Sequence, residues 1–272
     1  MVTIIAEIGI NHNGDIELCK NLMMLAKVAG CEFAKLQKRT SSLCVPDKQK
    51  NILKDTPWGK MTYLEYKERI EFNDAQIAEL FDFAKQIDIG LFASVWDLPS
   101  VDLMCKYSKI GKIPSALVTN KKLCAYARSK FETLMISTGM RTEDEVLSLR
   151  EFNPNIVFHT NSQYPSELDS LNLKYMHHLK RNFPKAKVGY SGHEQSIFPT
   201  IGAVAMGAEI IERHITFDKN MWGSDHNSSL TPDELFLLVK ACIEVDKAIQ
   251  FPAGPRKLFD GELVKRKSLR GV

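Results

Sequence analysis

The chain has 272 residues, 44% of them hydrophobic and 25% charged, and its formal net charge is +3. This is the composition of an ordinary soluble globular protein. The only dense basic stretch is Lys265 to Lys267 with Arg270, so we do not expect the long basic face that nucleic-acid binding requires.

The six cysteines show neither a C-x-x-C motif nor a framework spacing, which indicates reduced cysteines in a cytosolic protein. The opening stretch MVTIIAEIG is typical of a strand and lacks the basic leader of a signal peptide. No apolar run reaches the length of a membrane span. We therefore expect a cytoplasmic protein that makes no membrane contact.

Eight strand-then-helix units are predicted in chain order. Strands are expected at 3–7, 33–37, 90–94, 109–113, 133–137, 156–160, 187–190 and 209–214. Helices are expected at 15–29, 73–86, 120–129 and 170–182, and others are expected to begin near 100, 142, 196 and 231. A long polar insertion over 39–60 separates the second strand from its helix, and loops of that length are usually lids or binding loops.

This alternation predicts an α/β fold with a parallel sheet, and eight units fit a closed (β/α)8 TIM barrel. The alternative is an open doubly wound sheet, which usually carries G-x-G-x-x-G after its first strand. Here the corresponding turn is GINHNG over 9–14, which does not match. We expect one barrel domain over 1–250 and an irregular basic tail over 251–272.

Polar residues stand at nearly every strand end, although strand interiors favour apolar residues. They are Glu7, Lys35, Gln37, Ser94, Lys112, Ser115, Ser137, Ser162, Tyr164, Ser191, His193, Glu212 and His214. In a barrel all of these side chains converge on the C-terminal mouth, where barrel enzymes place their chemistry.

Lys35 lies within an apolar strand, and Lys112 stands in a similar position in the fourth strand. A buried lysine must be paired or functional. One interpretation is a structural ion pair, for Lys35 with a carboxylate such as Glu7. The functional interpretations are an oxyanion cradle for phosphate and carboxylate, or a Schiff-base lysine. Two lysines beside a histidine pair favour the cradle.

His193 and His214 each follow an apolar run. A single histidine of this kind is more often structural, but two at neighbouring strand ends indicate a divalent-metal site that keeps open positions for substrate. The two-residue period of a strand places Glu212 on the inward face with His214. Glu212 is then either an electrostatic group below the metal or part of a structural ion pair. Asp225 follows in a Gly-Ser-rich loop whose default interpretation is a solvated turn.

Seven motifs together resemble the sialic acid synthase family, in order along essentially the whole chain. They are IAEIGINHNG at 5–14, KLQ at 35–37, KIPS at 112–115, STGM at 137–140, GYSGH at 189–193, ERHIT at 212–216 and GSDH at 223–226. The resemblance implies a (β/α)8 barrel that condenses phosphoenolpyruvate with an N-acylated hexosamine, such as N-acetylmannosamine. The product would be a nine-carbon 2-keto acid, with phosphate released.

The resemblance also implies roles for individual residues. His193 and His214 would hold a divalent ion, with Mn2+ expected and Mg2+ or Co2+ as alternatives. Phosphoenolpyruvate would contact Lys35, Ser94, Lys112, Ser115, Ser137, Ser162 and Ser191. Gln37, Tyr164 and Asp225 would face the sugar, Glu7 would sit beside the reacting centre, and Glu212 would support it.

Three departures from the family pattern concern the sugar side. The family usually continues into a small antifreeze-like domain that reaches a partner subunit, and this chain stops where the connector to it would begin. Leu117 stands where some members carry a sugar-contacting glutamate, and Ser162 stands where some carry asparagine. We expect a homodimer, with a separate cap-domain protein as a further candidate partner.

Two other functions are compatible with the sequence. One is a metal-assisted sugar-acid synthase or lyase on the same barrel, for instance one that acts on a phosphorylated sugar. An extra cationic cluster at the mouth would favour this function, and Lys38 and Arg39 stand there. The other is a non-catalytic barrel that binds a sugar or a partner protein. Buried polar groups argue against a scaffold because they cost stability.

Overall fold

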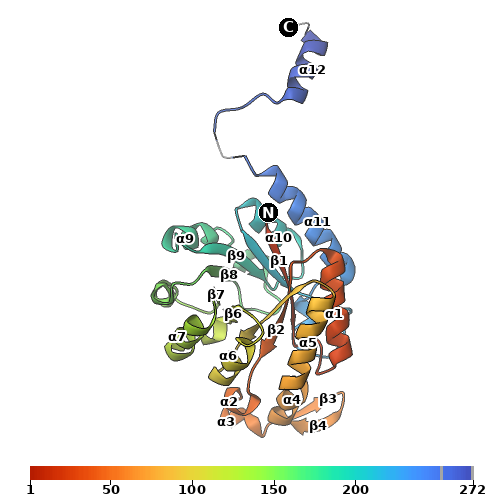
Figure 1. Cartoon of the computed structure of the whole chain (residues 1–272), viewed down its shortest axis with the longest axis vertical. Coiled ribbons are helices and arrows are strands. Elements are labelled where there is room, and N and C mark those ends of the chain that lie inside the picture. Colours follow the sequence, from red (N-terminus) through yellow and green to blue (C-terminus); the bar gives the residue numbers. More distant parts are fainter. Residues whose placement is uncertain (252–253, 271–272) are drawn as a thin grey trace.

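In the computed structural model, which describes residues 1–251 and 254–270, eight parallel strands close into a barrel (Figure 1). The strand order around the barrel is β1-β10-β9-β8-β7-β6-β5-β2. The barrel strands are β1 (Thr3–Gly9), β2 (Phe33–Lys38), β5 (Gly90–Val95), β6 (Ile110–Ile113), β7 (Thr133–Ser137), β8 (Ile156–Thr160), β9 (Lys187–Gly192) and β10 (Ile210–His214). The predicted (β/α)8 TIM barrel is confirmed.

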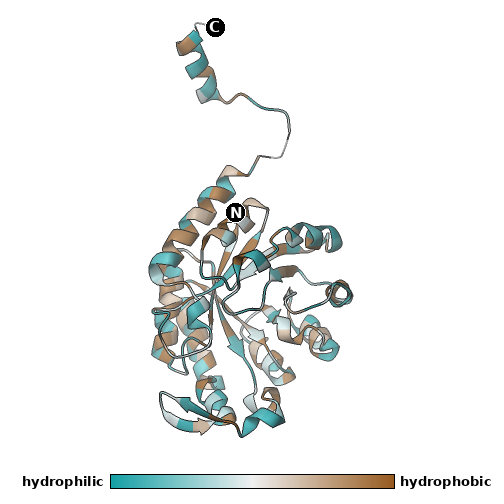
Figure 2. Ribbon diagram, turned by 180° about the vertical axis from the view of Figure 1, so that it is seen from behind, coloured by the Kyte–Doolittle hydropathy of each residue, from teal (hydrophilic) through white to brown (hydrophobic). Residues whose placement is uncertain are grey.

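A helix follows each barrel strand and covers the outside of the barrel. These helices are α1 (Ile16–Ala29), α5 (Asp74–Gln86), α6 (Leu98–Met104), α7 (Lys121–Lys130), α8 (Glu143–Ser148), α9 (Tyr175–Asn182), α10 (Phe198–Ala205) and α11 (Pro232–Ala248). Short 3-10 turns stand at Ser115–Leu117, Leu149–Phe152, Leu168–Ser170 and His226–Ser228. Figure 2 shows both hydrophobic and hydrophilic residues on the helices, as expected for elements with one face on the barrel and one in water.

The ends of several helices follow the local signals in the sequence. The Asp15 side chain accepts hydrogen bonds from the first turn of α1, and Gly30 ends that helix with φ 93°. Thr142 and Thr231 begin α8 and α11 with capping boxes to Glu145 and Glu234. The predicted helix over 170–182 is shorter, because α9 begins at Tyr175 after a 3-10 turn.

The core has two apolar parts. A large cluster lies between the strands and the helices around them. A smaller one fills the inside of the barrel floor, where Ile5, Phe92, Met135, Phe158 and Ile210 pack together. This floor closes the barrel below the mouth, so that a ligand can enter only from the C-terminal side of the strands.

The long polar insertion predicted over 39–60 contains regular secondary structure, which the sequence analysis did not predict. It forms α2 (Ser41–Cys44), α3 (Asp47–Lys50), the antiparallel hairpin of β3 (Leu53–Thr56) and β4 (Gly59–Thr62), and α4 (Tyr63–Ile70). The sequence prediction missed α4, although Thr62 and Glu65 form a capping box at its start. The insertion lies at the mouth end of the barrel in Figure 1.

The expectation of an irregular tail is wrong over its second half. Residues 260–270 form α12 (Asp260–Arg270), while 252–253 and 271–272 lie outside the described residues. Figure 1 shows α12 held away from the barrel, at the end opposite the insertion. Within the described part of the chain, no helix combines the length and the apolar character needed to cross a bilayer.

Candidate active site

Thirteen of the fourteen residues predicted for the site line one cavity of about 290 Å³ at the barrel mouth. They are Glu7, Lys35, Gln37, Ser94, Lys112, Ser115, Ser137, Ser162, Tyr164, Ser191, His193, Glu212 and His214. Asp225 is not among the lining residues, but its Oδ2 lies 3.8 Å from Nδ1 of His214. The strand ends that the sequence predicted to meet therefore do meet at this mouth.

The register of the sheet explains why these side chains meet. Glu7 of β1 is paired with His214 of β10 on one side and with Lys35 of β2 on the other. Ser94 of β5 is likewise paired with Lys112 of β6. Residues that are paired across parallel strands point to the same face of the sheet, so these side chains all enter the barrel together.

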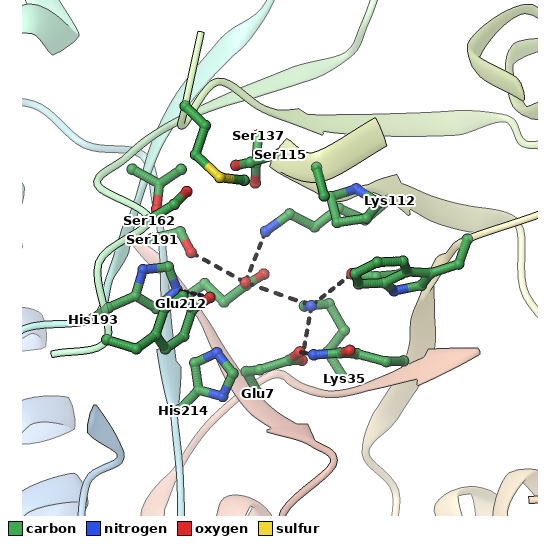
Figure 3. Close-up of a pocket in the computed structure, with 18 residues that line it drawn as sticks. Glu7, Lys35, Lys112, Ser115, Ser137, Ser162, Ser191, His193, Glu212 and His214 are labelled. Carbon is green, nitrogen blue, oxygen red and sulfur yellow. Dashed lines mark hydrogen bonds and ion pairs between the residues drawn. The ribbon is translucent and has the colours of Figure 1, made fainter. Parts of the chain in front are cut away.

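Two lysines and two glutamates form a charged layer directly above the apolar floor (Figure 3). Nζ of Lys35 lies 2.8 Å from Oε2 of Glu7 and 3.5 Å from Oε1 of Glu212. Nζ of Lys112 lies 2.7 Å from the same Glu212 oxygen and 4.2 Å from the centroid of the Phe158 ring. The lysines are thus paired with carboxylates, and an incoming anion would have to share them.

The pKa values of this layer follow from burial and charge. Burial lowers the pKa of Lys112 to about 8, despite the neighbouring Glu212. Burial alone would raise the pKa of Glu212, but Lys112 and Lys35 lower it to about 2. Burial raises the pKa of Glu7 even though Lys35 opposes the shift. The layer therefore offers one firmly ionised carboxylate, one that takes up a proton more readily, and a lysine that can release one.

Hydroxyl groups surround the charged layer. Ser94 accepts a hydrogen bond from Lys35 at 2.9 Å, and Ser191 donates one to Glu212 at 3.2 Å. Ser115 accepts a hydrogen bond from the backbone N–H of Gly139 at 3.1 Å. A Cβ atom at Gly139 would lie 2.3 Å from Oγ of Ser162, so only glycine lets the two serine hydroxyls converge there.

The two histidines lie at the opposite side of the same cavity, with ring centroids 5.4 Å apart. Nδ1 of His193 lies 2.6 Å from the carbonyl oxygen of Asn161, and its Nε2 lies 2.8 Å from the hydroxyl of Tyr164. Burial, assisted by His214, lowers the pKa of His193 to about 3, so the ring is neutral at physiological pH. Nδ1 of His214 is buried and has no hydrogen-bond partner.

These features fit a divalent metal ion. A neutral imidazole whose Nδ1–H is held by a backbone carbonyl presents Nε2 as a metal ligand, and the unpartnered Nδ1 of His214 is a second buried donor atom. Over residues 1–251 and 254–270, no group of three or more His, Cys, Asp or Glu side chains could hold a metal. The protein would thus supply two nitrogen ligands and leave the remaining positions to substrate and water.

Some lining residues were not predicted from the sequence. Trp96, Met140 and Thr160 line the cavity, and Trp96 also stacks on Arg39, whose guanidinium carbon lies 4.4 Å from its ring centroid. Trp96 and Thr160 stand next to predicted strand ends, so their positions alone could have found them. Nothing in the sequence pairs Arg39 with Glu71, which approaches its Nε to 2.8 Å.

Comparison with known proteins gives consistent matches. The sequence pattern of the NeuB family matches residues 22–252. N-acetylneuraminate-9-phosphate synthase of Mus musculus is 36% identical over 257 residues, which cover 92% of this chain and 71% of that protein. N,N'-diacetyllegionaminic acid synthase of Campylobacter jejuni is 36% identical over 258 residues, which cover 90% of this chain and 77% of the relative.

The fold also matches solved structures. The crystal structure of N-acetylneuraminic acid (sialic acid) synthetase from Leptospira borgpetersenii superposes with a TM-score of 0.86 at 27% identity. The match covers 99% of this chain and 92% of that one.

Proposed function

This chain belongs to the NeuB family of sialic acid synthases and is an enzyme, and we propose the following reaction for it. It condenses phosphoenolpyruvate with an N-acylated hexosamine of the N-acetylmannosamine type to a nine-carbon 2-keto acid, with release of phosphate. The observation that carries this proposal is a single cavity that holds a lysine–glutamate layer, several serine hydroxyls and two buried histidines.

The cavity suits phosphoenolpyruvate because that substrate carries a phosphate and a carboxylate. Lys35 and Lys112 supply charged donors, and Ser115, Ser137 and Ser162 supply hydroxyls above them. Since both lysines are already paired with glutamates, the substrate would share their N–H donors rather than meet free charges. The shared layer holds the lysines in fixed positions before the substrate arrives, which reduces the cost of ordering them.

We propose that His193 and His214 hold a divalent ion, Mn2+ in the first place. When bound, such an ion supplies Lewis-acid polarisation of the aldehyde of the open-chain sugar. Tyr164 lies against both rings, with its centroid 4.0 Å from that of His193 and 5.8 Å from that of His214. Tyr164 therefore borders the place where the sugar would bind.

Residues of the cavity can assist the formation of the carbon–carbon bond. C3 of phosphoenolpyruvate attacks C1 of the aldehyde, and the aldehyde oxygen takes a proton to become a hydroxyl. Lys112 is suited to supply that proton because its pKa is lowered to about 8. The positive charge that develops at C2 lies near the carboxylates of Glu7 and Glu212, which stabilise it.

Water completes the reaction at C2. Its oxygen bonds to C2 and one proton passes to Glu7, whose pKa is raised by burial. The C2–O bond to phosphate then breaks, inorganic phosphate leaves with the second proton, and a 2-keto group remains. The raised pKa of Glu7 suits it to accept this proton.

Two kinds of acceptor sugar are compatible with the relatives, one with a phosphate group and one without. The mouse relative is named for a 9-phosphate product and the Campylobacter relative for N,N'-diacetyllegionaminic acid, at the same 36% identity. We also propose that this chain forms a homodimer in the cytoplasm, with a separate cap-domain protein as a further candidate partner.

The test is phosphate release from phosphoenolpyruvate with Mn2+ and a panel of N-acylated hexosamines, with and without a phosphate group. We expect release that requires both a sugar and His214, and a loss of about a hundredfold or more in His214→Ala. His178→Ala is the matched control, because His178 lies at the surface against Glu143. Release without any sugar, or full activity in His214→Ala, would contradict the proposal.

A further inference from the structure

Lys67, in α4 of the insertion, is a buried lysine that the reaction above does not use. Its relative exposure is 9%, and none of the described residues forms a hydrogen bond or an ion pair with its ammonium group. Nζ lies instead over two aromatic rings, 4.9 Å from the centroid of Tyr66 and 5.4 Å from that of Tyr63. Contacts with ring faces satisfy none of its three N–H donors by conventional hydrogen bonds.

The neighbours of Lys67 place it beside the barrel mouth. The ring of Tyr66 meets that of Trp222 edge to face at 5.0 Å, and Trp222 opens the loop that carries Asp225. Asp225 in turn lies 3.8 Å from His214. A continuous series of contacts thus links the histidine pair to the ammonium group of Lys67, through the loop that carries Trp222 and Asp225 and through Tyr66.

Two other cations near the barrel mouth are already engaged by the protein. Arg39 is engaged by Glu71 and Gln37 and stacks on Trp96. Lys38 donates to the carbonyl oxygen of Phe72 at 2.8 Å. Lys67 therefore differs from Arg39 and Lys38 in having no hydrogen bond or ion pair with the described residues, and it differs from the exposed Lys54 in being largely buried.

Burial of most of the Lys67 side chain weakens its charged form unless an anion lies near it. Burial lowers the pKa of Lys67 to about 8 and Arg39 acts in the same direction, while Asp225 and Glu71 oppose the shift. An anion at Nζ would reverse both effects by supplying hydrogen-bond acceptors and negative charge. The chemistry of the position thus calls for an anionic group and gives no reason for a neutral one.

We propose that Lys67 binds a phosphate group on the acceptor sugar, at the end of the sugar remote from its aldehyde. This inference rests on the proposed condensation, in which the aldehyde faces the histidine pair. The sugar chain would then extend past Asp225 toward the insertion, where Lys67 lies under the aromatic rings of Tyr63 and Tyr66. The insertion would act as the part of the fold that selects a phosphorylated hexosamine.

The experiment compares N-acetylmannosamine with its 6-phosphate in steady-state assays of the full chain. In Lys67→Met we expect the KM for the phosphorylated sugar to rise roughly tenfold to a hundredfold relative to that for the unphosphorylated one. Lys67→Arg should recover most of this preference. Lys54→Met is the matched control, since Lys54 is an exposed lysine with Nζ 5.6 Å from the same Tyr63 ring.

The outcomes separate this inference from the proposed reaction. An unchanged KM ratio in Lys67→Met, with either sugar turned over, overturns the role of Lys67 and leaves the condensation intact. If neither sugar releases phosphate, the condensation fails, and calorimetric titration with the sugar phosphate then decides. Binding that requires Lys67 supports the site. Binding of the sugar phosphate that does not require Lys67 overturns it.

Discussion

Two buried networks of charged residues lie on opposite sides of the same barrel wall. Inside the barrel, Lys35 and Lys112 pair with Glu7 and Glu212. Outside it, Arg213 pairs with Glu194 at 3.2 Å, between β10 and α10. Neighbouring residues of β10 supply both networks, because Glu212 and His214 point inward and the intervening Arg213 points outward.

The two networks differ in how completely the oxygens of their glutamates are satisfied. Both oxygens of Glu194 accept hydrogen bonds, Oε1 from Arg213 and from Thr200 at 3.0 Å, and Oε2 from Tyr190 at 2.9 Å. Inside, Oε2 of Glu212 is buried without a hydrogen-bond partner. Outside, the atom without a partner is a donor, Nε of Arg213. A carboxylate whose two oxygens both accept hydrogen bonds holds strand ends in place, whereas one with an unsatisfied oxygen keeps an acceptor for a ligand.

Activity should fall most when the inner pair is removed as a whole, and far less when the outer pair is removed. In Lys112→Met with Glu212→Leu we expect kcat to fall about a thousandfold or more, because the anion donor and the carboxylate near C2 disappear together. In Glu194→Leu with Arg213→Met we expect kcat to stay within about tenfold. Rate assays on both purified double variants test this, and equal losses would remove the distinction between the two networks.

The second effect is on stability and concerns the outer pair alone. Arg213→Met leaves Glu194 buried without its counter-charge, so we expect the free energy of unfolding to fall by about 3–5 kcal/mol. Adding Glu194→Leu should recover most of that loss. Urea denaturation of the single and double variants measures both values.

The matched control is Glu209→Gln, which breaks an exposed pair with Lys180. It should cost less than about 1 kcal/mol.

Because His193 and His214 each adjoin a member of the outer pair, Mn2+ affinity should also weaken in Arg213→Met, by roughly tenfold. Stability loss without any change in Mn2+ affinity would show that the outer pair does not position the histidines.

The smallest effect is a dependence on pH that belongs to the inner network. Lys112 is charged below its pKa of about 8 and neutral above it, and both anion binding and proton donation need the charged form. We therefore expect kcat/KM for phosphoenolpyruvate to fall as the pH rises through about 8, up to tenfold per pH unit. Lys112→Arg keeps its charge in that range, so its profile should lose this limb. A limb that persists in the variant would assign the titration to another group.

The sequence predicted the parts of this site that depend on local pattern. Alternation of strands and helices gave the barrel, and the strand ends gave Glu7, Lys35, His193 and His214 as members of one mouth. The parallel register carries such predictions across long sequence separations, because every strand delivers its last residues to the same face.

The sequence could not predict which charges pair. Both lysines contact Glu212, which lies 177 residues from Lys35 and 100 residues from Lys112 along the chain. These contacts depend on the directions of the side chains inside the barrel. No local sequence pattern predicts that Arg213 pairs with Glu194 either. The sequence could not predict the burial of Lys67 for a related reason, because that burial depends on how α4 packs against the loop that carries Asp225.

The path of α11 has a practical consequence. This helix begins at the mouth and carries the chain back to the barrel floor, where Asp246 lies 3.9 Å from the amino group of Met1. Figure 1 shows the labelled N-terminus on the side away from the insertion. A tether attached at Met1 would thus anchor the barrel by its floor. On a sensor surface or a solid support, the open mouth would face the flowing solution and remain accessible to substrate.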